Sequence, residues 1–175
     1  MSARKLSFLS LMITLTLLAT YIEHLIPSPI PFVPGIKLGL ANAVILTLLY
    51  LFDAKTSLTV NILRIILASM LFSGFSSMIY ALIGGILSFT IMCVAKKSQC
   101  FSIIGVSVLG ATAHNFAQIC VAALILDNKN LFYYLPVLII AGVITGILVG
   151  YISFCLVRYL HNYSNILNSH PDTSS

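Results

Sequence analysis

The feature that most constrains this chain is a series of long apolar runs that few charged residues interrupt. Of its 175 residues, 59% are hydrophobic and only 7% are charged. A water-soluble domain of this length needs more polar surface than that to cover its core. The sequence therefore predicts an integral membrane protein. The formal net charge of +5 gives no indication of a nucleic-acid partner, because most of it follows the loop bias described below.

The charges and turn residues divide the chain into six candidate transmembrane helices of about the length that a bilayer requires. Only helices or a closed barrel satisfy their backbone groups in lipid, and these runs lack the period-two alternation of barrel strands. No small-x-small cleavage site follows the first run, which we interpret as a retained span. The sequence predicts an all-α six-transmembrane-helix bundle with spans at 6–26, 37–52, 56–72, 78–94, 101–126 and 132–159.

The distribution of Lys and Arg predicts the orientation of this bundle, because cytoplasmic loops carry the excess of these residues. With both termini in the cytoplasm, only Lys37 and Lys129 lie outside, and the other loop cations lie inside: Arg4, Lys5, Lys55, Lys96, Lys97 and Arg158. We expect a multi-pass protein of the cell (inner) membrane. Residues 1–161 form the helical domain, and the polar segment 162–175 is expected to be a disordered cytoplasmic tail.

The cysteines show no pattern of a metal site or disulfide framework. Cys93, Cys100, Cys120 and Cys155 are scattered within or beside the spans, and no Cys/His spacing resembles a zinc site. The sequence also contains no Walker A loop or visible nucleophile motif. No metal and no cofactor are expected.

Polar residues within the third expected span point to a cavity. Asn61 and Arg64 lie three residues apart and therefore share a helix face. Arg64 lies roughly 12 Å above the cytoplasmic end, which is too deep for a simple interfacial position. Ionisable groups at such depth are costly and usually face a cavity or a partner. An internal pair between Arg64 and Glu23 is the alternative.

Other spans bring polar groups to a similar depth. His114, Asn115 and Gln118 lie in the fifth span, and Asn42 lies in the second. These residues either hydrogen-bond helices together or line a shared cavity, and His114 is equally explained as a neutral core histidine. The joint pattern favours a substrate-binding cavity for a polar or anionic ligand, because Arg offers a planar donor fork to carboxylate or phosphate. The predicted site comprises Lys37, Asn42, Asn61, Arg64, His114, Asn115 and Gln118.

Two further features concern the outer loop and the last span. The loop from Pro27 to Gly35 contains four prolines, and it is either a lid over an outward-facing cavity or plain punctuation between helices. Gly142, Gly146 and Gly150 form a small-residue stripe, which packs within the chain or against a partner subunit.

Two motifs carry a resemblance to a known family. The run "PGIKLGLAN" at 34–42 and the weaker "YALIGGILS" at 80–88 resemble heptaprenyl diphosphate synthase component I, also called the Gx transporter family. The resemblance extends over most of the chain through the sixth span. This family is similar in turn to the S components of energy-coupling factor (ECF) transporters.

The resemblance implies an S-component-like bundle that captures a small molecule from the outer side. S components dock onto a membrane coupling subunit driven by two ATPases, commonly through an Ala-x-x-x-Ala patch on the first span. Here that span offers Ser10 with Thr14 and Thr16 with Thr20 instead. We expect the substrate-binding membrane subunit of a small-molecule transporter.

The family name implies the rival function, a non-catalytic accessory subunit that supports a soluble prenyl synthase subunit in isoprenoid and menaquinone biosynthesis. Prenyl-chain elongation needs aspartate-rich motifs that hold magnesium against the diphosphate. The acidic residues here are isolated from one another: Glu23, Asp53, Asp127 and Asp172. The chain is therefore not expected to be an enzyme by itself.

Overall fold

The computed structural model of this chain describes residues 3–25 and 39–169, with side chains for 6–25 and 39–161. Within these ranges the chain is helical apart from short connections and contains no strand, which confirms the all-α expectation for the described residues. The elements are α1 (Ala3–Leu25), α2 (Leu40–Leu51), α3 (Ala54–Ala68), the π-helix η1 (Ser69–Ser73), α4 (Gly74–Ser98), α5 (Ile103–Ile125), the 3₁₀-helix η2 (Lys129–Tyr134) and α6 (Leu135–Ser169).

The expected count of six membrane spans is not confirmed. In the described part of the chain, four segments are long and apolar enough to cross a membrane: Leu6–Leu25, Ala54–Ser98, Ile103–Ile125 and Lys129–His161. Helices α3, η1 and α4 follow one another within the second of these. Helix α2 has 12 residues, a rise of about 18 Å, and is shorter than the hydrocarbon core. The helices are compatible with a multi-pass membrane protein.

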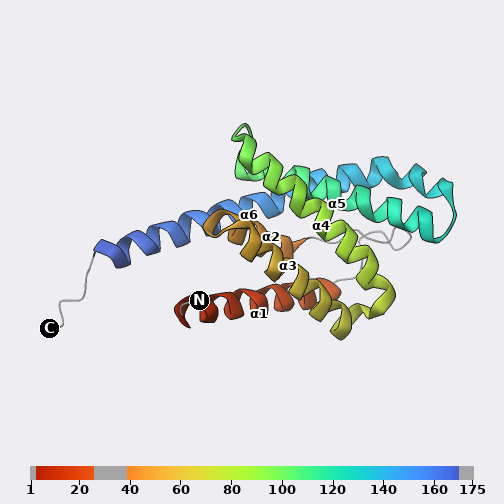
Figure 1. The fold of residues 1–175 in the computed structure, drawn as a ribbon. Helices are drawn as coiled ribbons and strands as arrows, with labels where there is room; N and C mark the ends of the chain where they lie inside the picture. Colours follow the sequence, from red (N-terminus) through yellow and green to blue (C-terminus); the bar gives the residue numbers. More distant parts are fainter. Residues whose placement is uncertain (1–2, 26–38, 170–175) are drawn as a thin grey trace.

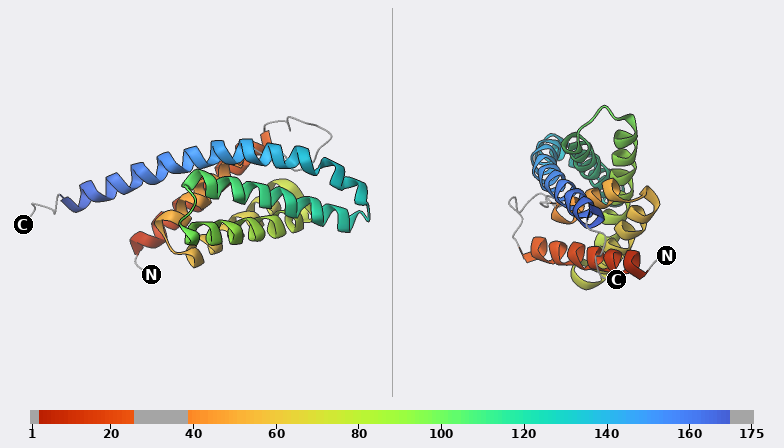
Figure 2. Two further views of the ribbon diagram at one scale, coloured as in Figure 1. Left: turned by 90° about the horizontal axis from the view of Figure 1, so that it is seen from above. Right: turned by 90° about the vertical axis from the view of Figure 1, so that its left-hand side faces the viewer.

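The long helices run between two ends of the bundle. Figure 1 shows the start of α1 and the end of α6 at one end, and the connection between α5 and α6 at the other. In the left view of Figure 2, α6 extends past the other helices. The backbone of α6 stays helical to Ser169, beyond residue 161, where the sequence predicts a disordered tail. Which end faces the cytoplasm stays a prediction.

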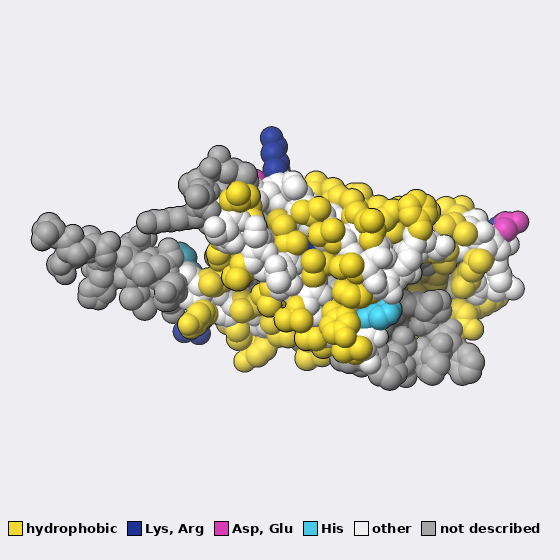
Figure 3. Space-filling model, turned by 90° about the horizontal axis from the view of Figure 1, so that it is seen from below, with side chains coloured by type: hydrophobic (Ala, Val, Ile, Leu, Met, Phe, Trp, Pro, Cys, Tyr) yellow, Lys and Arg dark blue, Asp and Glu magenta, His cyan; other side chains and the backbone are white. Residues whose placement is uncertain are grey.

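The outer surface suits a lipid environment. Large apolar side chains are exposed along α1, α5 and α6, among them Leu11 at 62%, Leu124 at 81% and Ile140 at 61%. Figure 3 shows one face on which hydrophobic side chains cover a broad area and few charged ones appear. Apolar patches of this extent are typical of surfaces that contact lipid or another protein.

Helix α2 forms the centre of the bundle. Ile45, Leu46 and Leu48 are completely buried, and Leu49 is 1% exposed. A helix that is apolar on all sides is stable only when other helices surround it. Its C-terminal end is fixed by Lys96 of α4, whose Nζ donates a hydrogen bond to the Leu49 carbonyl at 2.6 Å. The central position of α2 carries Asn42, in its first turn, into the interior.

Local sequence signals fix two of the helix starts. The Asp53 carboxylate accepts a hydrogen bond from the Thr56 amide at the start of α3, and the Ser102 hydroxyl accepts one from the Gly105 amide at the start of α5. Both are common N-cap residues, which satisfy amides that have no partner within the helix. These caps separate the helices at short turns, so that adjacent helices run beside each other.

The glycine stripe on α6 packs against α5 of the same chain. A Cβ atom added at Gly146 would lie 2.7 Å from the Cα of Val108, and one added at Gly150 would lie 2.7 Å from the Cα of Ile104. Backbones that approach this closely exclude any side chain at the contact. Of the two readings that the sequence leaves open for the stripe, packing within the chain is therefore the one observed.

Candidate functional site

The helices enclose a central cavity with a volume of about 120 Å³. A water molecule needs roughly 10–15 Å³ by this measure, so the cavity has room for about ten waters or a ligand with about ten non-hydrogen atoms. Its polar lining comes from the helices α1 to α6 and η1. The polar lining residues are Thr20, Glu23, Asn42, Arg64, Ser69, Ser73, Ser77, Ser88, Ser107, His114, Asn115, Gln118 and Thr145.

Arg64 is the central polar group of this cavity, and two asparagine side chains hold it. Its side chain is only 9% exposed. Its Nε donates a hydrogen bond to Asn61 Oδ1 at 3.0 Å, and its Nη2 donates one to Asn42 Oδ1 at 2.6 Å. A guanidinium has five N–H groups, so these two bonds leave three for other acceptors. A buried cation whose hydrogen-bond acceptors are neutral amides, and which keeps spare donors, can bind a carboxylate or a phosphate.

Asn61 lies behind Arg64 and is not among the lining residues. Its Nδ2 donates a hydrogen bond to the Gly85 carbonyl of α4 at 3.3 Å, while its Oδ1 accepts from Arg64. Its side chain is 2% exposed. Asn61 thus connects α3 to α4 and fixes the direction of the guanidinium.

We expect Asn61→Ala to weaken binding of small carboxylates to the purified protein by at least about tenfold, because a buried hydrogen bond to a charged group contributes about 1.5–3 kcal/mol. Isothermal titration calorimetry with butyrate measures this, and thermal melting reports stability separately. Asn130→Ala, at an exposed asparagine outside the cavity, is the matched control. Equal butyrate affinity in the Asn61→Ala and control proteins would contradict the positioning role.

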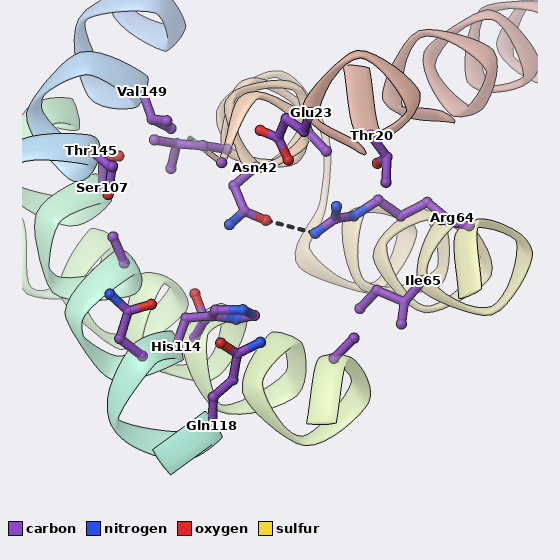
Figure 4. A pocket seen from close by; sticks show the side chains of 18 of the residues that line it. Thr20, Glu23, Asn42, Arg64, Ile65, Ser107, His114, Gln118, Thr145 and Val149 are labelled. Carbon is purple, nitrogen blue, oxygen red and sulfur yellow. Dashed lines mark hydrogen bonds between the residues drawn. The ribbon is translucent and has the colours of Figure 1, made fainter. Parts of the chain in front are cut away.

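The wall opposite Arg64 comes from α5. Figure 4 shows Asn42, Glu23 and Arg64 close together, with His114 and Gln118 across the opening from them. Gly84 of α4 permits this arrangement, because a Cβ at that position would lie 3.0 Å from the His114 ring and 3.2 Å from Gln118 Cγ. A ligand between the two walls would meet the guanidinium on one side and an imidazole and an amide on the other.

Asn115 both connects helices and lines the cavity. Its Nδ2 donates a hydrogen bond to the Leu138 carbonyl of α6 at 2.8 Å, and the side chain is 8% exposed. The hydrogen-bonding role that the sequence allows for this residue is therefore present. It coexists with a place in the cavity wall.

Glu23 lies on the same side of the cavity as Arg64 and interacts with it electrostatically. Its Oε1 accepts a hydrogen bond from the Leu40 amide, the first residue of α2. The preceding Gly39, at φ +79°, has no side chain to cap this helix, so a carboxylate from α1 takes that place. Glu23, which the sequence offers as an internal partner of Arg64, is thus close to Arg64 and also caps the start of α2.

The structure brings together most of the predicted site residues. Asn42, Arg64, His114, Asn115 and Gln118 line one cavity, and Asn61 supports it from behind. Lys37 and the proline-rich loop from Pro27 to Gly35 lie outside the described residues. Their predicted roles in binding and as a lid stay predictions.

Three serines in the cavity wall were not among the predicted site residues. Ser69, Ser73 and Ser77 line the cavity, and Ala81, four residues after Ser77, lines it as well. The chain at Ser69–Ser73 is π-helical, and the Gly74 amide donates to the Ser69 carbonyl five residues earlier. π-Helical turns are frequent at functional sites. These serines are four residues apart in the sequence, and this spacing indicates a shared helix face.

Groups that could hold a metal do not occur in the part of the chain that the structure describes. Among the side chains of residues 6–25 and 39–161 there is no set of three or more His, Cys, Asp or Glu arranged around a metal position. All four cysteines are free thiols. The described cavity lining offers hydrogen-bonding and charged side chains.

Comparison with known proteins gives one match. A family model described as heptaprenyl diphosphate synthase component I matches residues 12–156. This range contains every described residue of the cavity wall. No curated protein and no solved structure matches the chain.

Proposed function

This chain belongs to the heptaprenyl diphosphate synthase component I family, and we propose that it serves such a synthase as a non-catalytic membrane subunit. The family match carries this proposal. Component I is not the catalytic subunit, which agrees with the expectation that this chain is not itself an enzyme. The family name also implies another synthase component as a partner. In this role the bundle would place that component at the membrane, where long prenyl products accumulate.

Deletion of the gene tests this function. We expect the long-chain prenyl product, measured by mass spectrometry of lipid extracts, to fall and to return when the unmodified chain is expressed again. The purified chain should also retain the catalytic subunit in an affinity pull-down from detergent extracts. Unchanged product levels after deletion would reject the accessory role.

The central cavity favours a second candidate, a substrate-binding membrane subunit of a small-molecule transporter. A buried arginine with spare donors, opposite an imidazole and an amide, is suited to a small polar or anionic solute. A membrane subunit that only places another protein needs no such cavity. This candidate would require an energy source in a partner, such as a coupling subunit with ATPases, or in an ion gradient.

The two candidates predict different results for the same deletion. Loss of solute uptake with normal prenyl product supports the transporter subunit, and the reverse supports the synthase subunit. Complementation with Arg64→Gln adds a second distinction. This variant should fail to restore solute uptake, whereas a subunit that acts only through its outer surface should still restore the prenyl product.

A further inference from the structure

The central cavity contains two opposite charges on one wall. Of the described residues that line it, the basic one is Arg64 of α3 and the acidic one is Glu23 of α1. They are close enough to interact electrostatically. His114 faces them from α5. A ligand in this cavity therefore meets one cation and one anion.

Glu23 is a fixed charge and not a mobile one. Its carboxylate accepts the hydrogen bond of the Leu40 amide, at the start of the most deeply buried helix of the bundle. The carboxylate thus stays in the wall, beside Arg64, when a ligand enters.

This arrangement limits the charge of the ligand. The spare N–H groups of Arg64 can bind one carboxylate as a bidentate pair. A second negative charge on the same ligand finds no further cation among the described lining residues and is repelled by Glu23. Unpaired charge is costly in such an enclosed site. A diphosphate, with several negative charges, is therefore a poor ligand.

We propose that the central cavity binds a compact ligand with a single carboxylate group, and that Glu23 is the specificity-determining residue that rejects diphosphates and other polyanions. The inference rests on the proposed use of this cavity as a ligand site. The volume of about 120 Å³ matches a ligand portion of about ten non-hydrogen atoms. A heptaprenyl chain is far larger than that.

The test compares ligands of matched size and different charge on the purified full-length chain in non-ionic detergent, at pH 8 and constant ionic strength. Butyrate and succinate share a four-carbon skeleton with one and two carboxylates, and inorganic diphosphate supplies the polyanion. Isothermal titration calorimetry gives each dissociation constant. We expect butyrate to bind at least about tenfold more tightly than succinate or diphosphate.

Glu23→Gln removes the charge and keeps an oxygen that accepts from Leu40. We expect it to strengthen succinate and diphosphate binding by about tenfold relative to butyrate. Asp127→Asn removes one negative charge at an exposed turn after α5 and should leave the three affinities unchanged. If Glu23→Gln does not fold, the charge series on the unmodified chain decides the question.

Three results would overturn the inference: binding of none of the carboxylates, diphosphate binding as tight as butyrate binding, or an equal effect of Glu23→Gln on all three ligands. None of these results depends on prenyl product levels. The accessory role of the chain can therefore fail while this inference holds, and the inference can fail while the accessory role holds.

Discussion

Replacing Arg64 by Gln is expected to abolish measurable butyrate binding to the purified protein. The guanidinium is 9% exposed and supplies the spare donors of the cavity wall. Removing one partner of a buried, hydrogen-bonded charge pair costs about 2–5 kcal/mol, which is roughly 30-fold or more in the dissociation constant. Calorimetry with butyrate measures the loss, and native mass spectrometry shows whether any copurified small molecule is lost as well.

A matched control separates this effect from a change of net charge or fold. Arg158→Gln removes the same side chain from an exposed position near the end of α6 and should bind butyrate normally. Arg64→Lys keeps the charge but loses the planar fork, and we expect it to bind more weakly than the unmodified chain. Normal butyrate binding by a folded Arg64→Gln protein would show that the cavity is not the binding site.

Replacing Gly146 by Leu is expected to lower the free energy of unfolding of the bundle strongly. A Cβ at this position would lie 2.7 Å from the Cα of Val108, which is a backbone atom and cannot move aside as a flexible side chain can. Overpacking a tight contact costs about 1–3 kcal/mol and sometimes more. We expect a loss of about 3 kcal/mol or more here, because α5 and α6 must separate along the stripe. Thermal melting in detergent and size-exclusion chromatography measure the effect.

The control is a substitution at the next residue of the same helix, α6. Ile147 is 48% exposed and faces away from α5, so Ile147→Leu should leave the melting temperature nearly unchanged. If the Gly146→Leu protein has the same melting temperature as the control, α5 and α6 do not approach each other as closely as they do in the structure.

Several elements of the fold and site follow from local sequence. The apolar runs predict helices compatible with a membrane, because few other structures satisfy backbone groups in lipid. The spacing of Asn61 and Arg64, and of His114 and Gln118, predicts a shared face on each helix, because residues three or four apart are neighbours on a helix. The four residues accordingly meet at or behind one cavity.

Other elements depend on contacts that no local pattern contains. The apolar run of α2 predicts a membrane span, whereas the structure has a 12-residue helix at the centre of the bundle. Asn61 shares the helix face of Arg64, but the close approach of Gly85 on α4 places it behind the guanidinium and not in the wall. Ser69 and Ser73 line the cavity from η1, a π-helical turn that the apolar run of the sequence did not predict.

By itself, the sequence of this protein determined the helical, lipid-compatible class of the chain and the polar face of each helix, because hydrophobicity and helical periodicity are local properties. Only the tertiary structure decided which faces meet. The approach of α6 to α5, the central place of α2 and the position of Glu23 between the start of α2 and Arg64 all depend on the shapes of helices distant in sequence. The cavity wall contains side chains from several helices, so the cavity and its balance of charge exist only when these helices pack in the folded bundle.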